Sequence, residues 1–119
     1  MSLSAARTLD ALGDPVRRRV VELLADGPRP AGEIVEALRD ERGLSQPGTS
    51  RHLRVLREAG LVTSTADAQR RVYSLAPGAL RDAQDWLDQV SAFWTQRLDA
   101  LGTEVARGRR GRQDIQEAP

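Results

Sequence analysis

Few side chains in this sequence could carry covalent chemistry. The single histidine, His52, lies near the hydroxyl groups of Ser45 and Ser50. A serine nucleophile needs a histidine base, which an acid orients, and the acid we expect nearby, Glu58, should face outward on the same helix. The chain has no cysteine, which excludes disulfides, thiolate nucleophiles and thiol redox sensing. These residues predict a protein that is not an enzyme.

A metal site is the second chemistry that the residues could supply. Asp82, Asp85 and Asp88 recur at helical spacing and could form half of such a site, but no histidine accompanies them. Carboxylates alone bind zinc-like ions poorly. We therefore expect a solvated acidic face there, with no metal and no other cofactor.

The charge distribution favours nucleic-acid binding in one part of the chain. Arginine supplies all 18 basic side chains, and the net charge of +1 does not by itself indicate a nucleic-acid partner. Residues 45–75 nevertheless carry a net charge of +3, whereas residues 76–106 carry −3. The positive charge is thus concentrated in the middle of the chain and in the last residues. The consecutive Arg17, Arg18 and Arg19 are expected to form a solvated face.

Four helices are predicted within the first 60 residues. Apolar spacing and stop signals place them at residues 4–12, 15–25, 31–40 and 45–59. In the fourth helix, Ser45 is expected to be the N-cap and Gly60 to supply the left-handed C-terminal residue. If Leu53 and Leu56 face inward, Thr49 also turns inward, Arg51 and Arg54 point away, and Ser50 and His52 flank the outer face.

A hairpin and one long helix complete the pattern. Residues 61–65 and 70–75 are rich in β-formers, with Arg70 and Arg71 just after the tip of the hairpin. No proline interrupts residues 78–106, where apolar residues recur every seven positions. Such a helix is longer than a small domain needs to cover its own core, so we expect a second copy of the chain to cover its apolar face.

Length and composition predict a single domain. The 119 residues correspond to one domain over residues 1–106, followed by a polar tail over 107–119 without fixed structure. No apolar run approaches the roughly 20 residues that cross a bilayer, so we expect a cytoplasmic protein without membrane contact. The predicted fold is mostly α with a β-hairpin wing, a winged helix-turn-helix with a long C-terminal dimerisation helix.

Two motifs resemble those of the ArsR family of bacterial repressors. They are ALGDPVRR at residues 11–18 and LSQPGTSRHLRVLREAGLV at residues 44–62, and the resemblance covers about residues 9–77. It implies a homodimer, built from the first and last helices, that binds double-stranded DNA at an inverted repeat. The chain departs from the family pattern in having no known family metal site and in a longer connection at residues 39–44. Its last helix resembles that of metal-independent members.

The resemblance assigns roles to individual residues. It places Gln46, Ser50, Arg51 and His52 near bases and counts Thr49, partly packed, among the DNA-binding residues. It gives phosphate contacts to Arg54, Arg57, Arg70 and Arg71. The apolar positions of the first and last helices are expected to form the dimer interface: Leu9, Leu12, Leu80, Leu87, Val90, Trp94, Leu98 and Leu101.

Two alternatives to a simple repressor remain open. The small net charge and acidic last helix also fit a winged-helix dimerisation or protein-interaction module with little specific DNA affinity. Separately, Trp86, Phe93 and Trp94 could bind a small apolar effector, although aromatic residues at helical spacing more often belong to a core or an interface. For His52, the alternatives are DNA contact and packing under the wing.

Overall fold

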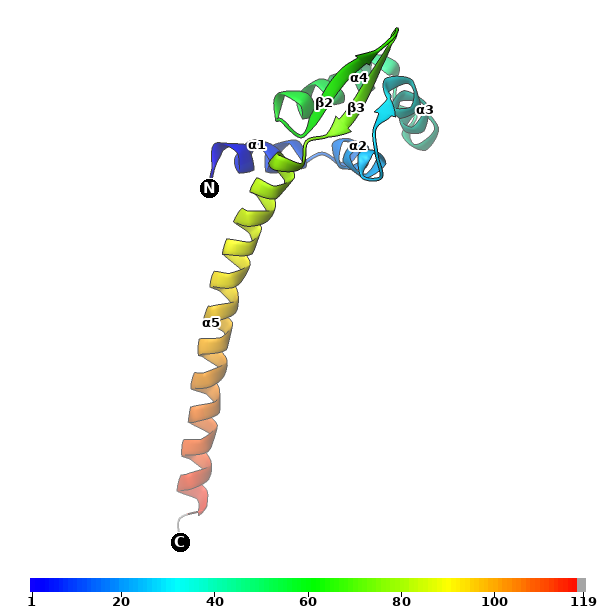
Figure 1. Cartoon of the computed structure of the whole chain (residues 1–119). Helices are drawn as coiled ribbons and strands as arrows, with labels where there is room; N and C mark the ends of the chain where they lie inside the picture. The colour runs from blue at the N-terminus through cyan, green and yellow to red at the C-terminus, as the bar shows by residue number, and fades with distance from the viewer. Residues whose placement is uncertain (118–119) are drawn as a thin grey trace. The chain divides into compact units, whose positions relative to one another are not determined.

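The computed structural model describes the backbone of residues 1–117 and the side chains of residues 1–109. Its elements, in chain order, are α1 (Leu3–Ala11), α2 (Pro15–Leu24), β1 (Arg29–Pro30), α3 (Ala31–Arg42), α4 (Gln46–Glu58), β2 (Val62–Asp67), β3 (Arg70–Leu75) and α5 (Pro77–Glu117) (Figure 1). The predicted winged helix-turn-helix fold, mostly α with a β-hairpin wing, is confirmed. The chain divides into two compact units, residues 1–84 and residues 85–119.

Side-chain caps fix where the helices of the first unit begin. The carboxylate of Asp14 accepts hydrogen bonds from the backbone N–H groups of Val16 at 2.8 Å and Arg17 at 3.1 Å, and Pro15 takes the first position of α2. Ser45, as predicted, caps α4 by accepting from the Gly48 N–H at 3.2 Å. Each cap satisfies an amide that the helix itself leaves free, so both helix starts are set by local sequence.

The turn before α4 is shorter than the sequence predicts. The sequence predicts that the third helix ends near Asp40, but α3 continues to Arg42 and only residues 43–45 separate it from α4. Gly43 ends α3 with φ +66°, a left-handed conformation that glycine adopts without steric cost. Residues 41 and 42 therefore extend α3, and a turn of three residues connects it to α4.

The core of the first unit lies between α2, α3, α4 and the sheet. Its fully buried side chains include Val20 of α2, Ile34 and Leu38 of α3, and Leu56 of α4. α4 contributes one face, because its inward residues Thr49, Leu53 and Leu56 are 0–3% exposed. Burying an aliphatic side chain contributes roughly 1.5–3 kcal/mol. This packing is what holds the outer face of α4 in a fixed orientation.

The wing is a three-stranded antiparallel sheet in the order β1-β3-β2. The hairpin is confirmed, with Asp67 opposite Arg70 and a turn at Ala68 and Gln69. Strand β1 was not predicted: Arg29 pairs with Tyr73, and Pro30 pairs with Val72. Two residues carry too little alternation to signal a strand, and a proline is tolerated because β1 is an edge strand.

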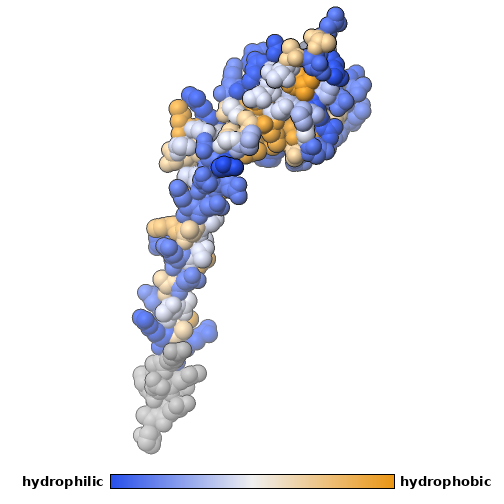
Figure 2. All heavy atoms as spheres, in the orientation of Figure 1, coloured by the Kyte–Doolittle hydropathy of each residue, from blue (hydrophilic) through white to orange (hydrophobic). Residues whose placement is uncertain are grey.

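Helix α5 is longer than expected. It spans 41 residues to Glu117, where the sequence predicts an end near Ala106 and a separate tail from 107; residues 118–119 of that tail lie outside the described residues. The sequence has no proline from Gly78 to Ala118, and glycines at 102 and 108 weaken a helix without ending it. In the second unit, Figure 2 shows hydrophobic side chains at intervals among hydrophilic ones.

Candidate nucleic-acid interface

The outward face of α4 presents polar and basic side chains. Gln46, Ser50, Arg51, Arg54 and Arg57 are all exposed, as the helical spacing predicts, and the buried inner face keeps them pointing away from the core. Amide, hydroxyl and guanidinium groups are the side chains that hydrogen-bond base edges and phosphates. An α-helix with this surface fits the major groove of B-form DNA.

Thr49 lies on the opposite face of the same helix. It was placed among the DNA-binding residues, but its side chain is 0% exposed and therefore cannot reach a duplex on the outer face of α4. Its hydroxyl has no hydrogen-bond partner among the described residues. The structure gives Thr49 a packing role.

His52 is partnered by a carboxylate that sequence reasoning missed. Its Nδ1 lies 3.9 Å from Oδ1 of Asp14, and the two side chains are 20% and 32% exposed. Glu58, the acid on the same helix, is exposed, as predicted. Asp14 belongs to the ALGDPVRR motif at residues 11–18, but the motif alone does not indicate that it lies near His52. Of the two serines considered with His52, Ser45 uses its hydroxyl to accept from the Gly48 N–H and cap α4.

Several interactions set the charge state of Asp14. Burial by itself would raise the pKa of this carboxyl, but the hydrogen bonds from the N–H groups of Arg17 and Val16 lower it, and the charges of His52 and Arg17 act in the same direction. The net result is a pKa below the ordinary value of 3.8. Asp14 is thus a carboxylate at neutral pH.

The two arginines of the wing are held by neighbours on the hairpin. Arg70 forms an ion pair with Asp67 at 3.0 Å, and Arg71 donates a hydrogen bond to the Ser64 hydroxyl at 3.1 Å. Both arginines remain exposed. Arg71 has a neutral partner, whereas Arg70 shares its charge with a carboxylate. Of the two, Arg71 presents the less compensated positive charge.

The arginine run in α2 is not the plain solvated face that the sequence predicts. Arg17 and Arg18 donate hydrogen bonds to the Ala11 and Leu12 carbonyls, at 2.6 and 3.1 Å, and so satisfy the C-terminus of α1. Arg19 forms an ion pair with Glu41 of α3 at 2.9 Å, and their hydrogen bonding raises the pKa of Arg19 and lowers that of Glu41. These arginines tie helices of the first unit together.

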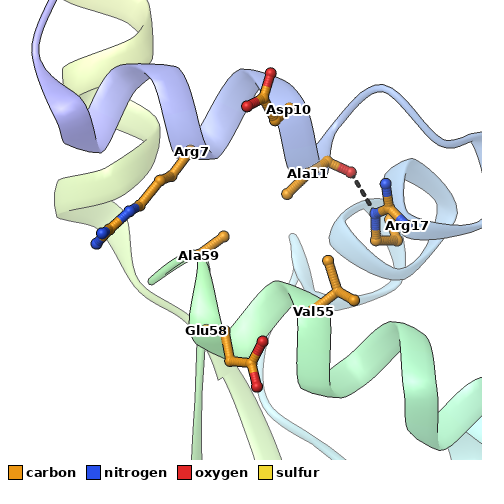
Figure 3. A pocket seen from close by; sticks show the side chains of 7 residues that line it. All are labelled: Arg7, Asp10, Ala11, Arg17, Val55, Glu58 and Ala59. Atoms are coloured by element: carbon orange, nitrogen blue, oxygen red, sulfur yellow. Dashed lines mark hydrogen bonds between the residues drawn. The ribbon is translucent and has the colours of Figure 1, made fainter.

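A cavity of about 350 Å³ lies between α1, the start of α2 and the end of α4. Figure 3 shows Ala11, Val55 and Ala59 directed toward it, with Arg7 and Glu58 at its edges. Asp10 and Arg17 complete the lining, which therefore combines an apolar floor with charges of both signs. The predicted effector residues Trp86, Phe93 and Trp94 do not line this cavity.

Most of the apolar side chains predicted on α5 are exposed in the single chain. Leu87, Val90, Trp94, Leu98 and Leu101 are 47–59% exposed, whereas Leu80 of the first unit is packed against the core. Leu9 of α1 and Leu12, the C-cap of the same helix, are half-buried. Trp86 is half-buried as well, and Phe93, 62% exposed, has the Arg97 guanidinium 6.0 Å from its ring centroid.

No metal centre is apparent in the described part of the chain. Asp82, Asp85 and Asp88 are all exposed, and among the described residues no group of three or more His, Cys, Asp or Glu side chains could hold a metal ion. The helices of that part also include none that is long and apolar enough to span a membrane.

Comparison with known sequences identifies a matching domain family and relatives that match most of the chain. Residues 12–65 match a family described as a helix-turn-helix domain. The HTH-type transcriptional regulator Rv2034 of Mycobacterium tuberculosis is 41% identical over 95 residues, covering 80% of this chain and 82% of the relative. The transcriptional repressor SdpR of Bacillus subtilis is 34% identical over 77 residues, covering 65% of this chain and 81% of the relative.

Solved structures show the same architecture. A possible transcriptional regulator for arsenical resistance is 35% identical, with a TM-score of 0.63 over 82% of this chain and 94% of the other. The homodimeric winged helix-turn-helix DNA-binding domain of a possible ArsR-family regulator from Mycobacterium bovis is 29% identical, with a TM-score of 0.58 over 75% and 78%. Together with the motifs at residues 11–18 and 44–62, these relatives show that the chain belongs to the ArsR family of winged helix-turn-helix transcriptional regulators.

Proposed function

We propose that this regulator is a sequence-specific repressor that acts as a homodimer on an inverted-repeat operator. The observation that carries the proposal is the two-sided character of α4: its inner face is buried at Leu53 and Leu56, and its outer face exposes Gln46, Ser50 and Arg51. A rigid helix with base-reading side chains is what the recognition helix of a helix-turn-helix protein requires. Repression follows if the bound dimer blocks a promoter.

The proposed contacts divide into base-reading and phosphate-binding residues. Gln46, Ser50 and Arg51, on the first two turns of α4, read base edges in the major groove. Phosphates are bound by Arg54 and Arg57 farther along α4, and by Arg70 and Arg71 of the wing. The ion pair of Arg70 with Asp67 reduces the charge available there, so Arg71 contributes more of the salt-dependent affinity.

The proposed dimer is supported by the exposed apolar face of α5. Leu87, Val90, Trp94, Leu98 and Leu101 expose about half of their surface, and large apolar side chains gathered on one stripe mark interaction surfaces. A relative from Mycobacterium bovis is described as homodimeric, which supports a second copy as the partner. In this proposal Leu9, Leu12 and Leu80 add to the interface from the first unit.

A salt titration tests the DNA-binding proposal. Fluorescence anisotropy would compare the DNA upstream of the coding sequence with a scrambled duplex, at two salt concentrations. We expect tight binding to the native duplex and a steep loss of affinity with salt, because phosphate contacts release counterions. Equal, weak and salt-insensitive binding to both duplexes would instead favour a protein-interaction module, to which the acidic exposed residues Asp82, Asp85 and Asp88 are suited.

A further inference from the structure

One carboxylate oxygen of the first unit lies close to polar groups of two helices. Oδ1 of Asp14 accepts the N–H groups of Val16 and Arg17 at the start of α2, and the same oxygen lies 3.9 Å from Nδ1 of His52 on α4. The atom that caps α2 therefore also lies within ion-pair distance of His52 on α4, an ion pair that forms when the imidazole is protonated. Arg17, whose N–H binds this oxygen, also donates from its side chain to the Ala11 carbonyl at the end of α1.

The environment of His52 differs from that of its neighbours on α4. Ser50 and Arg51 are exposed, whereas the His52 side chain is only 20% exposed and its Nδ1 is directed to Asp14. A side chain that binds DNA directly gains by being free on the outer face. His52 is instead turned toward α2, against which α4 packs.

We propose that His52 is a positioning residue that acts through Asp14, and that the pair fixes the angle of α4 on α2 so that its outer residues meet base edges. The role rests on the proposed DNA-binding function and deepens it. It makes Asp14, which need not touch DNA, a determinant of sequence specificity. Small errors in the placement of a recognition helix weaken base contacts more than phosphate contacts, because base-edge hydrogen bonds demand tighter geometry.

Electrostatics and positioning predict opposite effects when Asp14 loses its charge. Removing a negative charge from a DNA-binding protein should strengthen its binding to every duplex, because phosphate repulsion is reduced. If Asp14 positions α4, the Asp14→Asn variant should instead lose affinity for the preferred duplex alone. Asparagine caps a helix about as well as aspartate, so α2 should keep its start in this variant.

A double-mutant cycle tests the coupling between the two side chains. The variants are Asp14→Asn, His52→Gln and the double variant, with Asp40→Asn at an exposed position of α3 as the matched control. Each single variant should weaken binding to the preferred duplex by about fivefold, and the double variant by about the same factor rather than about 25-fold. Affinity for a scrambled duplex should not fall. The proposal would be overturned if the losses of the two single variants multiplied in the double variant, or if Asp14→Asn lost no affinity.

A measurement without DNA separates the pair from the DNA-binding function. His52 is the only histidine of the chain, so its ring resonances in a proton NMR spectrum need no further assignment. They should move in Asp14→Asn and stay in place in Asp40→Asn; unmoved resonances would show that the pair does not form. If the wild-type protein prefers no duplex, the proposed function fails and the positioning role fails with it, while the spectrum still reports whether the pair exists.

Discussion

Replacing Thr49 by valine should stabilise the protein without changing its DNA affinity. The Thr49 side chain is fully buried, and its hydroxyl has no hydrogen-bond partner within the described part of the chain. A buried hydroxyl without a partner costs about 1–3 kcal/mol, and valine has the same branched shape without the polar atom. Both residues are β-branched, so the helix propensity of α4 changes little. We expect Thr49→Val to raise the free energy of unfolding by about 1–2 kcal/mol.

Thr8 provides the matched control for this prediction. It is equally buried, but its hydroxyl donates to the Ala79 carbonyl at 3.4 Å, so Thr8→Val should leave stability unchanged or lower it by up to about 1 kcal/mol. Urea unfolding followed by circular dichroism would give both free energies, and anisotropy would give the DNA affinity of each variant. Loss of stability in Thr49→Val would refute the reasoning about the hydroxyl. Loss of DNA affinity at unchanged stability would show that Thr49 contacts DNA after all.

Further predictions concern the interface, the dimer and the fold. Arg51→Ala should cost about 1–3 kcal/mol and relax base preference in a panel of single-base operator variants, whereas Arg71→Ala should weaken all sequences alike and lower the salt slope by about 1. Gly60→Ala should cost about 1 kcal/mol in thermal unfolding, because Gly60 has φ +80°. Leu98→Glu should shift sedimentation toward the monomer, because it places a charge on the exposed stripe of α5. The carboxylate of Asp14, with its lowered pKa, should stabilise the fold above about pH 4, and this contribution should be lost as the pH falls through the pKa of the folded state. The free energy of unfolding of Asp14→Asn should therefore fall less steeply with acid than that of the wild type.

The helices and the hairpin could be predicted because their signals are local. Asp14-Pro15 and Ser45 start helices by capping, Gly60 follows the end of α4, and the period of Thr49, Leu53 and Leu56 defines which face of α4 is buried. Once the buried face of α4 is known, the helical period also defines which residues are exposed. For that reason the exposure of Arg51 and Arg54 was predicted correctly from spacing alone.

The features that sequence reasoning missed depend on contacts between distant segments. Strand β1 exists because Arg29 meets Tyr73, 44 positions later, and two residues cannot reveal such pairing by periodicity. The carboxylate near His52 belongs to Asp14, which caps the start of α2, so the spacing of residues along α4 cannot reveal it. The arginines of α2 looked solvated because their acceptors, the Ala11 carbonyl and Glu41, belong to neighbouring helices.

Selection from a random pool of DNA duplexes tests whether the protein binds an inverted repeat as a homodimer. The wild-type protein would be incubated with the pool at near-physiological salt, and the bound duplexes would be sequenced after several rounds. A homodimer that reads DNA with two copies of α4 should enrich an inverted repeat with half-site centres about 10–10.5 base pairs apart, or a multiple of that spacing. Recovery of no common sequence, or of single half-sites and direct repeats, would contradict the account.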